Sequence, residues 1–405
     1  MKILVYEVLR DGYFNSMKQE KGRTGRKGES LKTRVCLVVS SPMTVQAFLS
    51  EPIRRLSEYY DIHIVANLGP GESLIGLDDS TKDVPVRIER KISPWHDLAA
   101  LYRMFRLFRQ CRFGLVHSVT PKAGLLAMTA AFLAGVNVRI HTFTGQVWAT
   151  RTGVSRWLLK CADRLIAWLS TDILADSPSQ HRFLLEEGVI SEAGSGVLAQ
   201  GSISGVDVSR FKPDAAARAR IRGELHFSED DVVFLYLGRL NHDKGLLDLA
   251  SAFAGMDNAA AQLLVIGPDE EGIGPQMLQR AEGNAGRVRF VGFTDRPEEY
   301  LSAADVLCIP SYREGFGNTV IEAAAVGIPA IGSRIYGLVD AISENDTGLL
   351  FEVGNVNELQ ACLLALSNDK ALREKLGRQA RERVLAKFTS ERLASAWLDY
   401  YRARV

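Results

Sequence analysis

The fold is decided by the segment Arg313–Glu322, whose sequence is REGFGNTVIE. Before it, Ala304–Pro310 is an apolar run closed by proline, which predicts a buried strand. After it, residues 318–326 have good helix-forming sequence that ends at a glycine. The segment therefore predicts a strand–loop–helix unit. Glu314 lies on the loop at the carboxyl end of the strand, and Glu322 lies about one turn into the helix.

The residues between the two carboxylates favour a ligand that carries both an anion and hydroxyl groups. Gly315 and Gly317, on either side of Phe316, allow the backbone to pass close to a ligand. The backbone N–H groups near Asn318 and Thr319 begin a helix, and such groups bind anions. Two carboxylates beside this anion site would accept hydrogen bonds from hydroxyls. A nucleotide sugar has this pattern of sugar hydroxyls, diphosphate and ribose hydroxyls.

A second loop supports this interpretation. Val232–Gly238 is a strand of the buried type, and the polar segment Arg239–Gly245 follows it. Arg239 offers a planar fork of donors and Lys244 a point charge, which together suit the two phosphates of a diphosphate. In open α/β sheets ligands bind at the carboxyl ends of the strands, so we expect both loops at one edge of a sheet.

The two motifs G-R-L-x-x-x-K-G and E-G-F-G-x-x-x-x-E together resemble the donor half of retaining GT-B glycosyltransferases of family 4. The similarity extends from about Thr33 to the C-terminus. In the N-terminal half, residues 118–124 and 141–148 resemble the branch that builds bacterial capsule, O-antigen and related surface glycans. The resemblance implies an α/β protein with two Rossmann-like domains that face a central cleft.

The alternation of short apolar runs with amphipathic segments also predicts parallel sheets built from βαβ units. We expect a basic tail at 1–32, either disordered or encoded upstream of the true start. An acceptor-side domain would span 33–203 and a nucleotide-sugar domain 204–385. By analogy, a last helix at 386–405 packs back on the first domain. Expected strands are 35–39, 62–66, 84–88, 115–117, 138–143, 173–175, 197–199, 232–238, 261–267, 288–291, 306–310, 330–332 and 349–351.

The resemblance assigns roles to the donor-side residues. Arg239 and Lys244 would neutralise the diphosphate as its bond to the sugar breaks. Glu314 would hold hydroxyls of the transferred sugar, and Glu322 would take the ribose hydroxyls. Phe293 lies in a segment that resembles the base-contacting loop of the family, although this segment is also compatible with a simple strand end.

Five acceptor-side positions follow from the same resemblance. Ser41 lies in a polar loop where many members of the family have a glycine-rich one. Lys122 could meet an acceptor phosphate or be an ordinary surface lysine. Near the sugar, the imidazole common in the family is either His141 or is replaced by Thr144, which precedes Gly145. Strand alternation places His141 and Thr144 on opposite faces, and we favour Thr144 and Gly145 as the cleft element.

No metal or other cofactor is expected. The sequence contains no Asp-x-Asp motif, and Arg239 and Lys244 already supply the charge that a divalent ion would bring to the phosphates. The partners implied are a nucleotide sugar and a lipid-linked glycan acceptor, with no nucleic acid.

Composition agrees with a cytoplasmic protein that contacts a membrane. Five cysteines without C-x-x-C spacing favour a reducing compartment, and no apolar run is long enough to cross a bilayer. Residues 1–200 contain 26 Lys and Arg against 19 Asp and Glu. The basic–aromatic stretches at 98–109 and 157–168 either pack on the sheet or lie on anionic lipid at the inner face of the cytoplasmic membrane.

The function predicted is transfer of a sugar, from a UDP-sugar by preference, to a hydroxyl of a polyprenyl-diphosphate-linked glycan. Retention at the anomeric carbon follows from the resemblance alone. Two rival hypotheses remain at this stage. A nucleotide-sugar epimerase of the same fold would need no acceptor, and a scaffold protein would bind nucleotide sugar without turnover.

Overall fold

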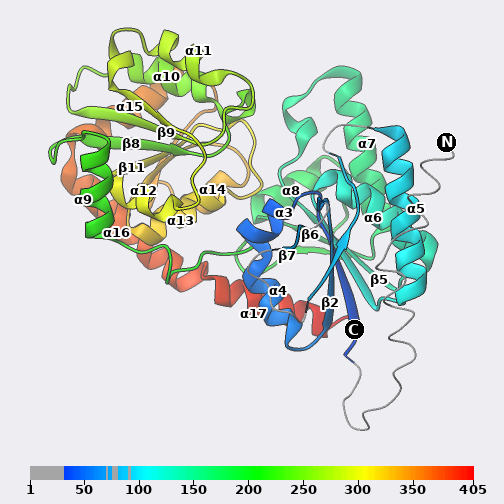
Figure 1. Ribbon diagram of the computed structural model, residues 1–405. Helices are drawn as coiled ribbons and strands as arrows, with labels where there is room; N and C mark the ends of the chain where they lie inside the picture. The colour runs from blue at the N-terminus through cyan, green and yellow to red at the C-terminus, as the bar shows by residue number, and fades with distance from the viewer. Residues whose placement is uncertain (1–31, 70–71, 75–80, 90–92) are drawn as a thin grey trace. The chain divides into compact units, whose positions relative to one another are not determined.

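The structure is a computed structural model that describes residues 32–69, 72–74, 81–89 and 93–405 (Figure 1). The expected basic tail therefore lies outside the described residues, apart from Lys32. Two sheets flanked by helices confirm the α/β class predicted from the alternation of apolar runs.

The first sheet has seven strands in the order β3-β2-β1-β4-β5-β6-β7. The pairings of β1 with β2 and β4, of β2 with β3, and of β4 with β5 are parallel. Its strands are β1 (Arg34–Val38), β2 (Asp61–Ala66), β3 (Lys82–Pro85), β4 (Leu115–Val119), β5 (Val138–Phe143), β6 (Asp172–Ala175) and β7 (Ser195–Val197). The order reverses between β1 and β4, so the carboxyl ends of these two strands mark the ligand-binding edge.

Helices α5 and α6 cover one face of the first sheet and α4 covers the other (Figure 1). The helical elements of this half are α3 (Pro42–Thr44), η1 (Val45–Leu49), α4 (Ser50–Ser57), α5 (Pro94–Cys111), α6 (Pro121–Ala134), η2 (Val147–Thr150), α7 (Gly153–Leu169) and α8 (Pro178–Glu186). Proline opens several of these helices, because its missing N–H costs nothing in the first turn.

The second sheet has six parallel strands in the order β10-β9-β8-β11-β12-β13. Its strands are β8 (Val232–Leu237), β9 (Ala261–Ile266), β10 (Val288–Val291), β11 (Val306–Ile309), β12 (Ala330–Ser333) and β13 (Gly348–Phe351). Here the order reverses between β8 and β11. These are the two strands whose following loops the sequence singled out.

Alternate residues of β8 enter two separate cores. Val233 and Leu235 pack with residues of α12, α13 and α16, whereas Phe234 and Tyr236 pack with residues of α10, α11 and α15. Figure 1 shows the two helix layers on opposite faces of the sheet. The helical elements of this half are α9 (Ala215–Glu224), η3 (His242–Lys244), α10 (Leu246–Ala254), α11 (Ile273–Ala281), η4 (Glu282–Arg287), α12 (Pro297–Ala303), α13 (Asn318–Val326), α14 (Leu338–Ala341), α15 (Val356–Asn368), α16 (Lys370–Lys387) and α17 (Ser390–Arg402).

By its internal packing the chain divides into two compact units. The first unit contains the described residues up to 142 together with 162–173 and 398–405, and the second contains 143–161 and 174–397. Within the first unit the last turns of α17 are tied to the sheet, since the Tyr401 hydroxyl lies 2.8 Å from Nδ1 of buried His117. Within the second unit, the Trp397 indole donates to the Ile203 carbonyl at 3.1 Å.

All five cysteines are free thiols. Over the ranges that the structure describes, we find no helix with the length and apolar character needed to cross a bilayer.

Candidate active site

The loops that follow β8 and β11 lie against each other, as expected from neighbouring parallel strands. The contact depends on Gly245, which has a left-handed φ of +65°. A Cβ atom at this position would collide with the carbonyl oxygen of Pro310, the first residue after β11. Only glycine satisfies both the backbone angle and the space, so this residue fixes how closely the two loops approach.

Lys244 and Glu314 meet at this junction. The Lys244 ammonium lies 2.5 Å from Oε1 of Glu314, and both side chains are about one-fifth exposed, at 20% and 19%. The Ser311 hydroxyl donates to the same carboxylate oxygen at 2.8 Å. The cation predicted for the phosphate and the carboxylate predicted for the sugar are therefore in direct contact, with their remaining surface open to a ligand.

Arg239 brings a second cation to the same loop. Its side chain is 46% exposed and pairs with Glu270 at 2.9 Å. Tyr236 of β8 holds the loop in place, since its hydroxyl donates to the Arg239 carbonyl at 2.8 Å. Gly238 has a φ of +157°, and a Cβ there would lie 2.9 Å from the Tyr236 hydroxyl oxygen. The glycine thus makes room for the tyrosine that positions Arg239.

An ion pair that the sequence did not reveal joins the two loops a second time. Arg313 donates to Asp243 at 2.9 Å and to the carbonyl of Gly145 at 3.1 Å. Burial alone would raise the pKa of Asp243, but hydrogen bonds from Arg313 and Thr150 and the charges of Arg313 and Arg151 together outweigh it and lower the pKa. Both residues sit inside the quoted motifs. Their pairing across 70 positions has no local sequence signal.

The helix start beyond the loop has the geometry of an anion site. Gly317 precedes α13 with a φ of +88°, and a Cβ there would approach Leu338 to 2.6 Å. Asn318 and Thr319 are the first two residues of the helix, where N–H groups have no partner within the helix. The Asn318 side chain accepts from the Ser202 hydroxyl at 2.8 Å. Phe316 is buried and packs on Phe388, so its ring belongs to the hydrophobic core of the second unit.

Glu322 and Phe293 are the two remaining donor-side residues, on α13 and after β10. Glu322 is partly buried, and loss of solvation raises its pKa to about 7. The charge of Arg210 partly offsets this effect, whereas Glu298 adds to it. Arg210 donates to Glu298 at 2.9 Å, so both groups belong to one network beside Glu322. Phe293 follows β10 and is 68% exposed, which leaves its ring available to a base.

Two of the three predicted acceptor-side residues in the first unit, His141 and Lys122, already interact with other side chains of that unit. His141 is fully buried, with Nδ1 at 2.8 Å from the Ser118 hydroxyl, and burial lowers its pKa to about 3. Lys122 forms an ion pair with Asp97 at 2.7 Å. Ser41 is partly exposed at the start of α3.

Thr144 and Gly145 are partly exposed in the loop after β5. The Thr144 carbonyl accepts hydrogen bonds from the side-chain amides of Gln146 and Gln180, each at 2.7 Å. A Cβ on Gly145 would lie 3.1 Å from backbone atoms of Glu314 and Gly315, all of them in the second unit. The structure therefore gathers Thr144 and Gly145 near Glu314, while His141 stays in the interior of the first sheet.

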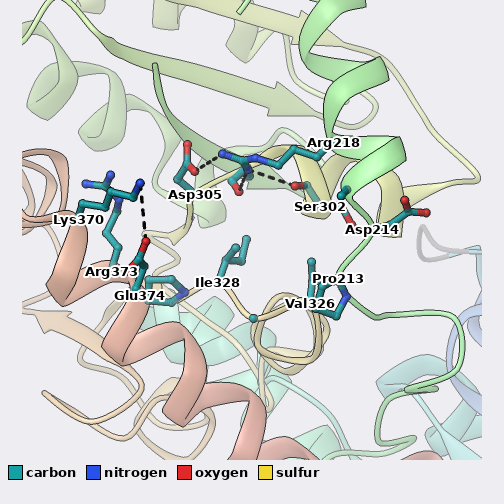
Figure 2. Close-up of a pocket in the computed structure, with 14 residues that line it drawn as sticks. Pro213, Asp214, Arg218, Ser302, Asp305, Val326, Ile328, Lys370, Arg373 and Glu374 are labelled. Atoms are coloured by element: carbon teal, nitrogen blue, oxygen red, sulfur yellow. Dashed lines mark hydrogen bonds and ion pairs between the residues drawn. The ribbon is translucent and has the colours of Figure 1, made fainter. Parts of the chain in front are cut away.

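A separate pocket of about 350 Å³ lies at the opposite edge of the second sheet (Figure 2). Asp305 and Pro329, which line it, precede β11 and β12 rather than follow them. Three cations and three acids contribute side chains to its wall, namely Arg218, Lys370, Arg373, Asp214, Asp305 and Glu374. The balanced charge and the position away from both loops separate it from the predicted donor site.

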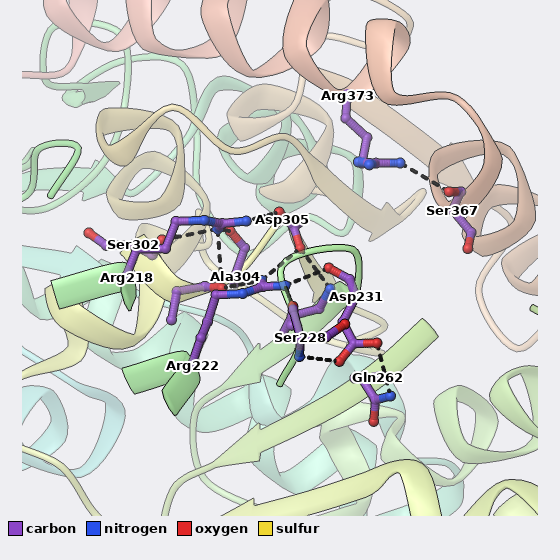
Figure 3. Close-up of polar contacts among 12 residues, drawn as sticks. Arg218, Arg222, Ser228, Asp231, Gln262, Ser302, Ala304, Asp305, Ser367 and Arg373 are labelled. Atoms are coloured by element: carbon purple, nitrogen blue, oxygen red, sulfur yellow. Dashed lines mark hydrogen bonds and ion pairs between the residues drawn. The ribbon is translucent and has the colours of Figure 1, made fainter. Parts of the chain in front are cut away.

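The guanidinium groups at this edge complete the ends of helices (Figure 3). Arg218 donates to the carbonyls of Ser302, Ala303 and Ala304 and to Asp305 at 2.7 Å. Arg222 is buried and donates to the carbonyls of Ala303, Ser228 and Asp231. Arg373 donates to the carbonyls at the end of α15. We therefore interpret these groups as structural, since each satisfies carbonyls that no helix or strand satisfies.

Two parallel Rossmann-like sheets, with cationic and carboxylate loops at the carboxyl edge of the second, define the GT-B class of glycosyltransferases. The model for "glycosyl transferases group 1" matches residues 217–383, and that for a "glycosyl transferase 4-like domain" matches 54–193. The chain belongs to this glycosyl transferase family.

Relatives of known name are similar over most of the chain. The capsular polysaccharide biosynthesis glycosyltransferase CapM of Staphylococcus aureus is 31% identical over 82% of this chain and 87% of its own length. The Escherichia coli UDP-Gal:alpha-D-GlcNAc-diphosphoundecaprenol alpha-1,3-galactosyltransferase is 26% identical over 78% of this chain and 82% of its own. Anabaena HepE, solved with UDP and glucose, matches with a TM-score of 0.76 at 15% identity, over 91% of this chain and 99% of its own. The last match supports the fold alone.

Proposed function

We propose that this glycosyltransferase moves a sugar from a UDP-sugar to a hydroxyl of a polyprenyl-diphosphate-linked glycan, with retention at the anomeric carbon. The observation that carries the proposal is the Lys244–Glu314 contact of 2.5 Å at the carboxyl edge of the second sheet. In this contact the cation that would bind the phosphate lies directly beside the carboxylate that would accept hydrogen bonds from sugar hydroxyls, which supports the proposal because sugar and diphosphate are joined at one bond.

The charges of the site suit departure of the nucleotide. When the bond between the anomeric carbon and the phosphate oxygen breaks, negative charge grows on the diphosphate. Lys244, half-exposed Arg239 and the N–H groups at the start of α13 supply positive potential there. We propose that these groups are sufficient without a metal ion.

The transfer to the acceptor needs no reagent beyond the donor and the acceptor hydroxyl. The acceptor oxygen bonds to the anomeric carbon while the bond between that carbon and the phosphate oxygen breaks. The acceptor proton passes to the leaving phosphate, which lies on the same face of the sugar. Glu314 would hold sugar hydroxyls and stabilise positive charge on the ring. Thr144 and Gly145 lie near this carboxylate, which supports a role in binding the sugar or the acceptor.

The choice of donor and acceptor is supported by the relatives. The E. coli relative carries UDP-galactose and a diphosphoundecaprenol acceptor in its name, and the S. aureus relative carries capsule synthesis. By analogy we place this chain in bacterial surface polysaccharide synthesis, at the cytoplasmic face of the membrane where a polyprenyl-linked glycan is built.

A thermal-shift screen tests the donor site first. UDP, GDP, ADP and their common sugar conjugates are compared on the wild type, Lys244→Ala and Glu322→Ala, with Lys370→Ala as a cation control far from the site. A ligand at 100 times its dissociation constant stabilises by about 2.7 kcal/mol. We expect a shift with uridine nucleotides that is lost in the two site variants and kept in the control. The absence of a shift with every nucleotide would contradict the proposal.

Product analysis then separates the proposed transferase from its rivals. Incubation of the selected UDP-sugar with polyprenyl-diphosphate-linked glycans should release UDP and increase the acceptor mass by one sugar. An intact nucleotide sugar with changed stereochemistry would instead indicate an epimerase. Tight binding without any turnover would indicate a scaffold.

A further inference from the structure

Helix α7 turns an apolar face toward solvent. Val154, Trp157, Leu158, Leu165 and Trp168 are 73%, 62%, 56%, 43% and 69% exposed. At 100° per residue these positions fall within an arc of about 100°, which is the stripe that a globular helix ordinarily buries. The helix has 17 residues and is therefore about 25 Å long.

The inward side of α7 accounts for little apolar burial. Only Asp163, Ile166 and Leu169 are buried on the helix, and one of these three is an acid. The amphipathic pattern is thus inverted relative to a helix that packs on its own sheet. Burying the outer stripe against an apolar phase would remove the exposed surface of five large apolar side chains from water.

The apolar surface continues onto α6 within the first unit. Phe132 and Leu133 are 44% and 58% exposed, and the Phe132 ring lies 5.4 Å from that of Trp168. We name this set of exposed residues the α6–α7 surface, and it consists of Phe132, Leu133, Val154, Trp157, Leu158, Leu165 and Trp168.

Cations border the α6–α7 surface. Arg164 is exposed on α7 itself, Arg151 is exposed just before the helix, and the Arg139 guanidinium lies 5.5 Å from the centre of the Phe132 ring. The two acids on or against α7 are neutralised or hidden. Glu187 accepts from Arg156 at 2.8 Å and from Lys160 at 2.6 Å, and Asp163 is buried.

We propose that the α6–α7 surface docks on an anionic phospholipid membrane. Tryptophan side chains favour the boundary between lipid headgroups and acyl chains, and arginines at the rim favour anionic headgroups. A second copy of the chain would bring cationic rims together, whereas anionic lipid complements them. The inference deepens the proposed function by naming the surface that contacts the membrane. It rests on that function in one respect, since the proposed acceptor is a lipid-linked glycan located in the membrane.

Vesicle co-sedimentation of the full chain tests the inference. The two vesicle compositions are phosphatidylcholine alone, and phosphatidylcholine with phosphatidylglycerol in equal parts. The wild type should bind the anionic vesicles, and its tryptophan fluorescence should shift to the blue. Trp157→Ser/Trp168→Ser should lower the partition coefficient about tenfold or more, since each lost side chain removes a large apolar area. Leu278→Ser/Leu385→Ser, which alters exposed leucines elsewhere, is the matched control.

Arg164→Glu tests the electrostatic part. It should weaken binding about tenfold on anionic vesicles and little on neutral ones. Equal binding by the wild type and the double tryptophan variant, or no binding of the wild type to anionic vesicles, would overturn the inference. A concentration-dependent dimer that the tryptophan variant abolishes, without vesicle binding, would overturn it in favour of an interface between copies.

The UDP-dependent thermal shift separates this inference from the proposed function. The double tryptophan variant should keep the wild-type shift, which also shows that it is folded. Vesicle binding without any nucleotide shift would refute the donor site and leave the membrane surface standing. A normal nucleotide shift without vesicle binding would refute the membrane surface and leave the donor site standing.

Discussion

Glu322→Gln should make the free protein more stable while it weakens the donor site. The carboxyl lies one turn into α13 and is partly buried, and loss of solvation raises its pKa from an ordinary 4.5 to about 7. Ionisation of Glu322 therefore lowers the stability of the folded protein. Glutamine has nearly the same shape and carries no charge, so it removes that cost.

The magnitude follows from the pKa shift. Each pKa unit corresponds to about 1.4 kcal/mol, so the shift to about 7 sets an upper limit of about 3 kcal/mol. The side chain retains some contact with solvent, and we therefore expect a gain of about 1 to 2 kcal/mol. Because the folded pKa is raised, the folded state binds more protons between the two pKa values. The wild type should thus lose stability as the pH rises from about 4.5 to about 7.

Urea unfolding at about pH 5 and about pH 8 measures this difference. Glu322→Gln should be more stable than the wild type at the higher pH, and the two proteins should nearly agree at the lower one. Glu382→Gln, which changes an exposed glutamate of α16, is the matched control and should change stability little at either pH. Equal stability of Glu322→Gln and wild type at about pH 8, or a gain that does not depend on pH, would refute the reasoning.

The same variant should bind nucleotide sugar less well. Ribose hydroxyls donate hydrogen bonds, and a carboxylate accepts them more strongly than an amide does. Each phosphate of a nucleotide sugar carries one ester and one anhydride bond and keeps a single, strongly acidic oxygen. A pH dependence of donor affinity near 7 that Glu322→Gln abolishes would therefore report on Glu322 rather than on the ligand. Affinity in the wild type should rise about tenfold between pH 6 and pH 8, and this rise should vanish in Glu322→Gln.

Three further outcomes are expected. Arg222→Met should cost about 3 to 5 kcal/mol in chemical unfolding, because it leaves the Ser228 and Asp231 carbonyls without this buried donor and removes one of the two guanidinium groups on Asp305. Arg220→Met on the exposed side of α9 should cost less than about 1 kcal/mol, and equal costs would contradict the structural role of Arg222. Lys244→Met should lower the kcat of UDP release about 100-fold or more without loss of fold, while Lys370→Met stays at the wild-type rate. EDTA should leave the transfer rate unchanged, and a loss that Mg²⁺ restores would contradict metal-independent transfer.

The regular elements were predictable because their signals are local. The strands expected at 138–143, 232–238 and 288–291 agree with β5, β8 and β10 to within a residue. Helix α6 begins and ends where proline and glycine predict, at Pro121 and Ala134. Buried parallel strands are continuous apolar runs, and prolines and glycines mark their ends, so neither feature depends on distant parts of the chain.

The site was predictable only as a set of residues. The sequence placed Lys244 and Glu314 on two loops at one edge, but their direct contact depends on the close approach that Gly245 allows. The Arg313–Asp243 ion pair was missed because it joins residues 70 positions apart. His141 and Thr144 were alternatives for the cleft position, and strand alternation favoured Thr144. In the structure His141 is buried beside Gly124 of α6.

The sequence by itself determined two parallel sheets, the order of their elements and the loops that carry the cations and carboxylates, because these depend on periodicity and on residue type at strand ends. Tertiary structure alone decided the electrostatics and the outer surface. The raised pKa of Glu322 exists only because the fold removes water from that carboxyl. The apolar stripe of α7 has the same period whether it faces inward or outward, and only the tertiary structure shows that Trp157 and Trp168 are exposed.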